Sequence, residues 1–327
     1  PTGDQEPDLA YITTSDEVMS TLIEVTVPAA GSDELTANEA AELVFRTFRE
    51  VESWASEWQS GAALAEVNRL AGGPPVEVPQ ELVSLTERGV RLGELTGGAF
   101  DISWAALWGV WDFTTETPAI PSEALLEERR SLINYASVSI DRERSTIQLP
   151  NPGMKLGLGG IAKGYALERS AEELRSAGIN SFTISAGGHI IAVGEKMTEP
   201  SNPRPWRVGI RAPRGGAADY FAVVEARDQS VSTSGDYERF FELGGQRYHH
   251  IIDPRTGFPS QAAMAATVVS SDATEADALS TALMVLGVAG LDIVNEMEGV
   301  EALVIDSDGA VRLSDGLIEG EGIFFTR

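Results

Sequence analysis

The sequence predicts an α+β fold with mixed sheets and helices. Two long segments, residues 33–58 and 79–95, repeat apolar side chains at helical spacing. Many shorter runs alternate apolar and polar residues at strand spacing. These helices and strands do not alternate one for one, as a doubly wound parallel sheet requires, so the α+β class is favoured.

The N-terminal half is expected to combine helices with a few strands. The apolar stripe of the first long helix includes Val44, Phe48, Trp54 and Trp58. Thr96, Gly97 and Gly98 end the second. In chain order the expected elements are a strand at 19–27, a helix at 33–58, a helix at 79–95, a tryptophan-rich stretch at 99–113, a loop at 114–124, a short helix at 122–132 and a hairpin at 137–148.

The C-terminal half is expected to be richer in strands. A glycine loop at 156–160 opens a helix, and two strands flank the Gly187-Gly188 pair. The expected elements are a helix at 162–177, strands within 181–193 and at 206–211, 221–226, 231–234 and 248–252, helices at 273–286 and near 291–297, and strands at 302–305 and 311–313.

The domain organisation is predicted to be simple. Residues 1–17 are polar and read as a flexible lead-in of the kind that follows a removed export signal, and residues 18–327 form a single domain. No apolar stretch is expected to be long enough to span a membrane. The polar lead-in and the absence of cysteine favour an exported or periplasmic protein, with a membrane anchor in any removed segment.

Composition excludes several classes of function. Acidic residues number 50 against 24 basic ones, a net charge of −26, which argues against binding to nucleic acid. The chain has no cysteine, so thiol catalysis, disulfides and cysteine-ligated metals are excluded. An anionic ligand would need positive charge supplied locally, by a cation, a basic side chain or a helix N-terminus.

The glycine loop is a candidate phosphate site. In LGLGGIAKGYA (156–166), glycines allow a ligand to approach the backbone, and the following helix presents free N–H groups. Lys163 adds a full positive charge. The spelling matches neither a Walker A loop nor GxGxxG, so a plain strand-to-helix turn is the alternative.

The helix at 273–286 carries a candidate cation site. Asp277 and Thr281 are four residues apart, which places both side chains on one face. A carboxylate beside a hydroxyl suits Mg²⁺. The alternative is an exposed aspartate and a threonine that bonds back to its own helix.

For the other candidate polar residues, a purely structural role is the alternative to a role in the site. His250 lies in a strand-like HIID segment, and its neighbour His249 is expected at the surface. Asp101 and Asp236 are loop acids, for which capping or turn roles are the default. The tryptophans of the 99–113 stretch have helical spacing typical of core packing, with stacking on a planar ligand as the alternative.

Taken together, the blocks resemble the ApbE family of flavin transferases, which move FMN from FAD to a protein threonine. The resemblance runs over most of the chain. Its blocks are MST (19–21), GAFD (98–101), LGGIAKGYA (158–166), the glycine pair (187–188), TSGDY (233–237), HIIDPRTG (250–257) and DATEADALSTAL (272–283).

The resemblance implies a fold and a ligand set. Family members have a T-fold-like architecture of two packed lobes, bind FAD in the cleft between them and hold Mg²⁺ on the pyrophosphate. It implies that Asp277, Thr281 and the carbonyl of Ala162 bind the metal. The partners implied are FAD and an acceptor protein that carries a threonine motif.

It also implies roles for the remaining site residues. Met19, Asp101 and Lys163 match positions that line the flavin nucleotide, together with Gly159 and Gly160. His250 matches a histidine near the reacting phosphate. We expect it to be the general base, with Asp277 as second candidate.

Two positions depart from the family pattern. His189 stands where an acid is common, and Gly157 where an aspartate is common. A non-catalytic FAD-binding protein therefore stays open. A Mg²⁺-dependent FAD pyrophosphatase that releases FMN and AMP also stays open, because water can replace threonine at the same site. The chain has no acceptor motif of its own, which indicates the modifying protein rather than the modified one.

Overall fold

The centre of the fold is an eight-stranded sheet. The computed structural model describes residues 10–29, 35–115, 117–197, 202–216 and 218–326. In spatial order the strands are β1 (Tyr11–Val18), β2 (Thr21–Pro28), β6 (Phe182–Ala186), β7 (His189–Val193), β12 (Gln229–Gly235), β15 (Ala263–Ser270), β16 (Val300–Asp306) and β17 (Val311–Leu313). All neighbouring pairs are antiparallel. Since β2 pairs with β6, the intervening chain leaves the sheet and returns to it.

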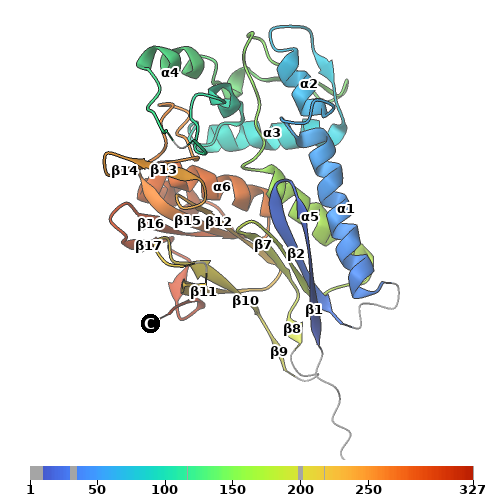
Figure 1. Ribbon diagram of the computed structural model, residues 1–327. Helices are drawn as coiled ribbons and strands as arrows, with labels where there is room; N and C mark the ends of the chain where they lie inside the picture. Colours follow the sequence, from blue (N-terminus) through green and yellow to red (C-terminus); the bar gives the residue numbers. More distant parts are fainter. Residues whose placement is uncertain (1–9, 30–34, 116, 198–201, 217, 327) are drawn as a thin grey trace, which may run out of the picture.

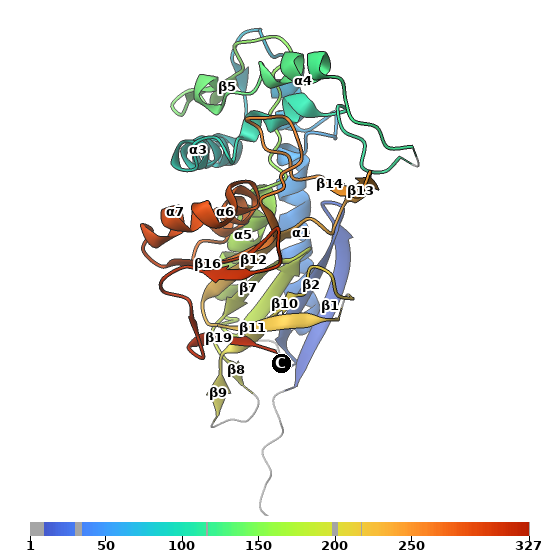
Figure 2. The same ribbon diagram turned by 90° about the vertical axis from the view of Figure 1, so that its left-hand side faces the viewer.

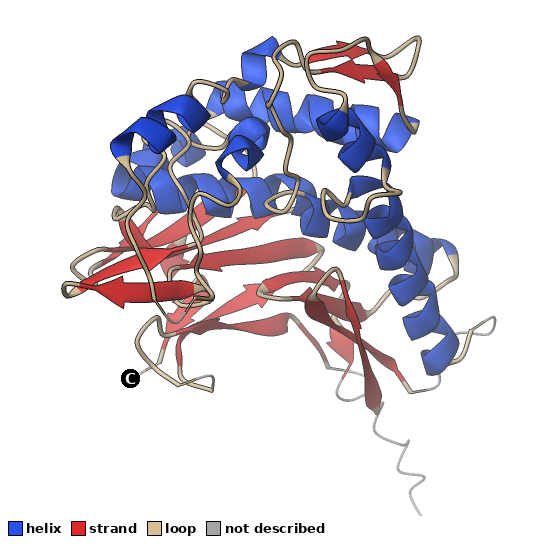
Figure 3. Cartoon of the chain, turned by 45° about the horizontal axis from the view of Figure 1, so that its top comes forward, coloured by secondary structure: helices blue, strands red, loops and turns tan. Residues whose placement is uncertain are grey.

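Helices cover one face of this sheet (Figures 1 and 3). They are α1 (Ala37–Ala55), α5 (Ala162–Ser176) and α6 (Ala273–Leu286). Helix α6 packs on β12 and β15 with one side and on α5 and α3 (Gln80–Leu95) with others. It is apolar nearly all round, as a helix enclosed on several sides must be. Asp277 is therefore carried into the interior.

A smaller sheet covers the other face (Figure 2). Its strands are β10 (Trp206–Arg211), β11 (Tyr220–Ala226), β19 (Gly322–Phe325) and β18 (Ile318–Glu319). Trp206 and Val208 of this sheet pack with Val231 and Leu303 of the large one in a second buried apolar cluster. The fold is thus layered as helices, large sheet and small sheet.

The chain between α1 and α5 builds a separate helical region, seen at the top of Figure 1. Its elements are α2 (Ala63–Arg69), α3, η1 (Ile102–Leu107), α4 (Glu123–Arg130), η2 (Tyr135–Ser137) and the small sheet of β3 (Val76–Glu77), β5 (Thr146–Gln148) and β4 (Ser139–Asp141). The remaining elements are β8 (Lys196–Met197), β9 (Pro203–Arg204), the hairpin of β13 (Phe240–Leu243) and β14 (Gln246–His249), η3 (Gly287–Gly290) and α7 (Leu291–Asn295).

An aromatic cluster joins the helical region to the β13–β14 hairpin. Trp111 stacks on Tyr248 with ring centroids 5.8 Å apart, and Phe241 packs on the same pair. The indole N–H of Trp111 donates to the carbonyl of Gly257 at 2.8 Å. These contacts of Trp111 hold the β13–β14 hairpin and the segment after it against the helical region.

The structure confirms the mixed α+β class and most predicted elements, and it corrects several boundaries. Residues 11–17, assigned by sequence to the lead-in, belong to β1, and Met19 lies in the β1–β2 turn rather than in a strand. Residues 1–9 lie outside the described part. The first long helix ends at Ala55, so Trp58 is not in its apolar stripe and is 72% exposed.

The prediction about membrane-spanning stretches is also wrong. The segment Ala273–Asn295 is long and apolar enough to cross a membrane by length and composition. It comprises α6, η3 and α7, and 67% of its most apolar window is buried inside the fold. Core helices pass the same test, and the contacts of α6 with two strands and two helices explain its apolar character.

Candidate active site

The site is built where the N-terminal parts of α5 and α6 meet. A methyl group at Gly164 would lie 2.2 Å from the carbonyl oxygen of Ala273 and 2.8 Å from Cβ of Asp277, so only glycine permits this approach. The backbone N–H of Gly164 then donates to Oδ2 of Asp277 at 2.9 Å. Helix α5, which follows the glycine loop, and helix α6, which carries Asp277, are thereby brought together.

Asp277 is buried, with a relative exposure of 1%. Its Oδ2 is fixed by Gly164, and Oδ1 accepts no hydrogen bond from any residue in the described ranges. The alternative of an exposed aspartate is therefore wrong. A buried carboxylate with one free oxygen requires a compensating charge.

Thr281 lies one turn further along α6. Its hydroxyl donates to the carbonyl oxygen of Asp277 at 3.3 Å, so the predicted alternative of a bond within the helix is present. A methyl group at Gly160 would lie 3.3 Å from Oγ1 of Thr281. The glycine loop therefore lies against the same face of α6 as the two side chains singled out from the sequence.

The start of α5 adds a carbonyl and a positive charge. Ala162 is the first residue of α5 and is 2% exposed. The ammonium group of Lys163 donates to the carbonyl of Gly159 at 2.9 Å, which holds it over the loop. A methyl group at Gly159 would meet nothing within 4 Å, so this part of the loop faces open space. Phosphate oxygens could enter there.

The charge of Lys163 reaches several titratable groups. Burial lowers the pKa of His189 and of His250 to about 4, and Lys163 adds to both shifts. Burial raises the pKa of Glu57 to about 7, and Lys163 opposes that rise. His189, His250 and Glu57 therefore lie within electrostatic reach of one lysine.

His189 was noted in the sequence only as a departure from the family pattern. It is the first residue of β7, directly after the Gly187-Gly188 turn, and is 5% exposed. Its Nε2 lies 3.5 Å from Oδ1 of Asp277. The structure thus adds an imidazole to the Asp277 side of the site, which no spacing rule could have revealed.

Met19 reaches the region through the β1–β2 turn. Met19 and Ser20 both have φ of 54°, a left-handed conformation uncommon outside glycine. A methyl group at Gly187 would lie 2.3 Å from Oγ1 of Thr21, so this turn abuts the turn that carries His189. Contact of Met19 with a flavin nucleotide stays a prediction.

The exposure predicted for His249, one of two adjacent histidines, is wrong. His249, expected at the surface, is 2% exposed; its Nε2 bonds the carbonyl of Ser260 at 2.7 Å and its Nδ1 accepts from the N–H of Ile251. Strand β14 ends at this residue, so His250 follows the strand and is half-buried. The Nδ1 of His250 is buried without a hydrogen-bond partner in the described structure, which leaves this imidazole available for chemistry.

Asp101 serves as a cap, as expected by default for a loop acid. Its Oδ1 accepts from the backbone N–H and the hydroxyl of Ser103, and its Oδ2 accepts from the N–H of Tyr135. Burial raises the pKa of Asp101, and these hydrogen bonds oppose the rise. A nucleotide contact by Asp101 stays a prediction.

Asp236 of the TSGDY block is neutralised by two arginines that the sequence did not single out. Arg214 donates to both its carboxylate oxygens, at 2.7 and 2.6 Å, and Arg247 of β14 lies 3.4 Å away. In the same block, Ser234 bonds the hydroxyl of Ser280 on α6 at 2.8 Å. The hairpin next to His250 is thus tied to the body of the fold.

A packing contact explains the glycine at position 157. A methyl group there would lie 2.9 Å from Nε1 of Trp104, and that indole N–H donates to the Gly157 carbonyl at 3.1 Å. Trp108 stacks on the exposed Trp58 with centroids 3.8 Å apart. The place of an aspartate side chain is therefore filled by indole.

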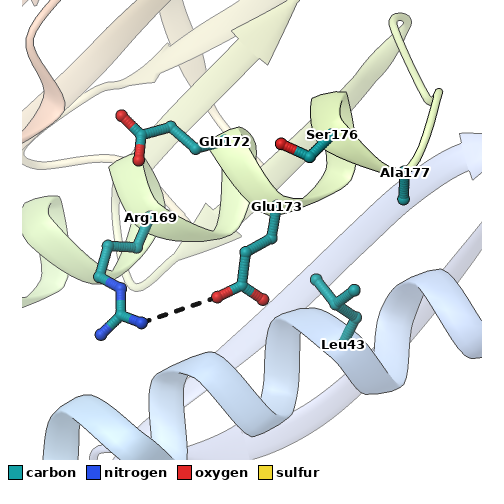
Figure 4. A pocket seen from close by; sticks show the side chains of 6 residues that line it. All are labelled: Leu43, Arg169, Glu172, Glu173, Ser176 and Ala177. Atoms are coloured by element: carbon teal, nitrogen blue, oxygen red, sulfur yellow. Dashed lines mark ion pairs between the residues drawn. The ribbon is translucent and has the colours of Figure 1, made fainter.

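A groove lies further along α5, beyond the candidate site. Figure 4 shows a groove between α1 and α5 lined by Leu43, Arg169, Glu172, Glu173, Ser176 and Ala177. Ser176 is the last residue of α5 and Ala162 the first, so the groove's far end is about 20 Å from the start of the helix. It is not part of the candidate site.

Comparisons with known proteins show which proteins this chain is similar to. The profile described as the ApbE family matches residues 19–304. An FAD:protein FMN transferase of Treponema pallidum (strain Nichols) is 37% identical over 291 residues, covering 86% of this chain and 80% of the relative. One from Klebsiella pneumoniae (strain 342) is 29% identical and covers 84% of both chains.

Solved structures are similar over almost the whole chain. The ApbE protein from Thermotoga maritima MSB8 superposes with a TM-score of 0.83 at 32% identity, covering 94% of this chain and 97% of that one. The flavin transferase ApbE from Vibrio cholerae superposes with a TM-score of 0.81 at 25% identity, covering 93% and 96%.

Proposed function

This chain belongs to the ApbE family and is an FAD:protein FMN transferase, and we propose that it transfers FMN with Mg²⁺ held where α5 meets α6. The observation that supports the metal most directly is the buried Asp277 carboxylate, whose Oδ1 accepts no hydrogen bond in the described part of the chain. FAD is the substrate and a second protein is the acceptor.

The residues at this place fit a hard cation. Within the described ranges no group of three or more His, Cys, Asp or Glu side chains could hold a metal ion. The oxygens of Asp277 and Thr281 and the carbonyl of Ala162 would therefore hold it together with oxygens of the substrate, a donor set that suits Mg²⁺. When bound, Mg²⁺ neutralises pyrophosphate charge and makes AMP a better leaving group.

The glycine loop and Lys163 supply the remaining stabilisation. The pyrophosphate would lie at the N-terminus of α5, where N–H groups and the helix dipole favour anions. Lys163, held over the loop by the carbonyl of Gly159, adds a full positive charge. Positive charge fixed in advance favours the transition state, in which negative charge moves onto the leaving AMP.

The transfer itself exchanges the phosphoanhydride bond of FAD for a phosphoester bond to the acceptor. The acceptor's threonine hydroxyl attacks the FMN-side phosphorus, the bond to the bridging oxygen breaks, and AMP leaves with that oxygen. We assign the hydroxyl proton to His250, which is neutral at pH 7 because burial lowers its pKa to about 4, and whose Nδ1 has no partner in the described structure.

The proposal is tested by following both products. The protein is incubated with FAD and an acceptor protein carrying a threonine flavinylation motif, with Mg²⁺ or with a chelator. We expect one AMP released per FMN attached to the acceptor, and neither product in chelator. AMP release at the same rate without acceptor would instead assign the site to FAD hydrolysis.

A further inference from the structure

The buried imidazole of His189 has a ring nitrogen without a hydrogen-bond partner in the described structure. The residue is 5% exposed, its Nδ1 is buried without a partner, and its Nε2 makes no hydrogen bond to any residue that the structure describes. Buried polar groups in proteins are nearly always paired, and an unpaired one calls for an explanation such as a bound ion.

The nearest polar atom to this ring suggests which ion. Nε2 of His189 lies 3.5 Å from Oδ1 of Asp277, and neither atom makes a hydrogen bond within the described ranges. Two neighbouring ligands of one ion, each about 2.1–2.2 Å from it, are separated by about 3.0–3.5 Å. The pair therefore has the spacing of two donors around a single cation.

The backbone holds this arrangement in place. His189 is the first residue of β7, and β7 is paired with β6 and β12 on both sides. Asp277 is fixed from the other side by the N–H of Gly164.

We propose that His189 is a nitrogen ligand of the cation held at Asp277, and that it shifts the metal preference of this enzyme from Mg²⁺ toward Mn²⁺. Mg²⁺ selects oxygen ligands, whereas imidazole favours transition-metal ions. The inference rests on the proposed metal site and adds the residue that sets its selectivity.

The test is electron spin-echo spectroscopy of Mn²⁺ bound to the full chain, which detects nitrogen directly coordinated to the metal. It is recorded with Mn²⁺ alone and with Mn²⁺ plus FAD. We expect an imidazole nitrogen coupling in the wild type that is lost in His189→Gln, whose side chain places an amide near Nε2. The chain has only three histidines, so the assignment is direct.

His249→Gln is the matched control. It removes another buried imidazole, one that bonds Ser260 instead of facing Asp277, and should leave the nitrogen coupling unchanged. Calorimetric titrations should show that the ratio of Mn²⁺ to Mg²⁺ affinity falls about 10-fold in His189→Gln and stays constant in the control. Should the glutamine variant not fold, as judged by circular dichroism, His189→Asn replaces it.

The outcomes separate this inference from the proposed function. Mn²⁺ binding that requires Asp277 but shows no histidine nitrogen, or a coupling that persists in His189→Gln, overturns the inference and leaves the metal site standing. Failure of Mn²⁺ to bind with or without FAD overturns both.

Discussion

The backbone N–H of Gly164 donates to the carboxylate of Asp277 at 2.9 Å, across a helix contact too close for any side chain at position 164. This one contact links the glycine loop, which suits phosphate, to the helix face that suits a cation. The proposed transfer depends on that link, because it needs the cation and the pyrophosphate to be held together.

Replacing Gly164 by alanine should destabilise the protein. The new methyl group would lie 2.2 Å from the Ala273 carbonyl oxygen, so α5 and α6 must separate, which costs about 2–3 kcal/mol. Gly159→Ala is the control, because its methyl group meets nothing within 4 Å and should change stability by less than about 0.5 kcal/mol. Urea denaturation measures both, and equal stabilities would contradict the packing argument.

Removing the charge of Lys163 should weaken the use of FAD. In Lys163→Met we expect kcat/KM for FAD to fall about 100-fold, because a fixed positive charge over the glycine loop is lost. Lys196→Met is the control: Lys196 lies over the ring of Trp206, 5.5 Å from its centroid, away from the loop. Similar losses in both variants would count against a specific role of Lys163.

His250→Gln should slow FMN transfer about 100-fold without preventing FAD binding, as expected on removal of a general base. Because the pKa of His250 is about 4, the wild-type rate should not decline through loss of this base until the pH falls toward that value. Single-turnover transfer rates across the acid range test this. A variant as fast as the wild type would require another proton acceptor.

His250 should also affect the pH dependence of stability. Its pKa is 6.5 as the ordinary value and about 4 in the fold, so between these values the unfolded chain binds a proton that the folded chain does not. The stability linked to this residue is fully present above pH 6.5 and is lost as the pH falls toward 4. Across that window His250→Gln should show a slope shallower by at most about 1.4 kcal/mol per pH unit. Parallel wild-type and variant profiles in urea denaturation would refute the shift.

Gly157 and Trp104 should be energetically coupled. Gly157→Ala would bring a methyl group to 2.9 Å from the indole nitrogen and should cost about 1–3 kcal/mol of stability. In a Trp104→Leu background the same change should cost much less, since the obstructing ring is gone. A double-mutant cycle measures the coupling, and additive effects would show that indole packing does not explain this glycine.

Much of the fold could be predicted because local patterns and packing agree. The α6 prediction matched Ala273–Leu286, since an aspartate cap at 272 and Gly287 mark its ends. Strand β1 was missed because its exposed residues lack a clear alternation and it is stabilised by pairing with β2. The first long helix was extended too far because the apolar Trp58 packs on Trp108 and not on the core.

The sequence predicts the residues of the candidate site but not the contacts between them. The sequence singles out Asp277, Thr281 and the glycine loop, and the structure places them together through Gly160 and Gly164, while their roles stay predictions. The burial of His249 was not predicted, because it depends on the carbonyl of Ser260 in a distant turn. The approach of His189 to Asp277 depends on how β7 meets α6, which no local pattern encodes. Export of the protein stays a prediction.

The most direct test of the central claim is FMN transfer by Asp277→Asn, which removes the charge but keeps an oxygen for the N–H of Gly164. Covalent flavin on the acceptor is measured by mass spectrometry with FAD and Mg²⁺, and circular dichroism verifies the fold. We predict transfer about 1,000-fold slower than in the wild type, with Mg²⁺ no longer increasing the rate. A folded variant that transfers FMN at the wild-type rate would contradict the assignment of Asp277 to the metal.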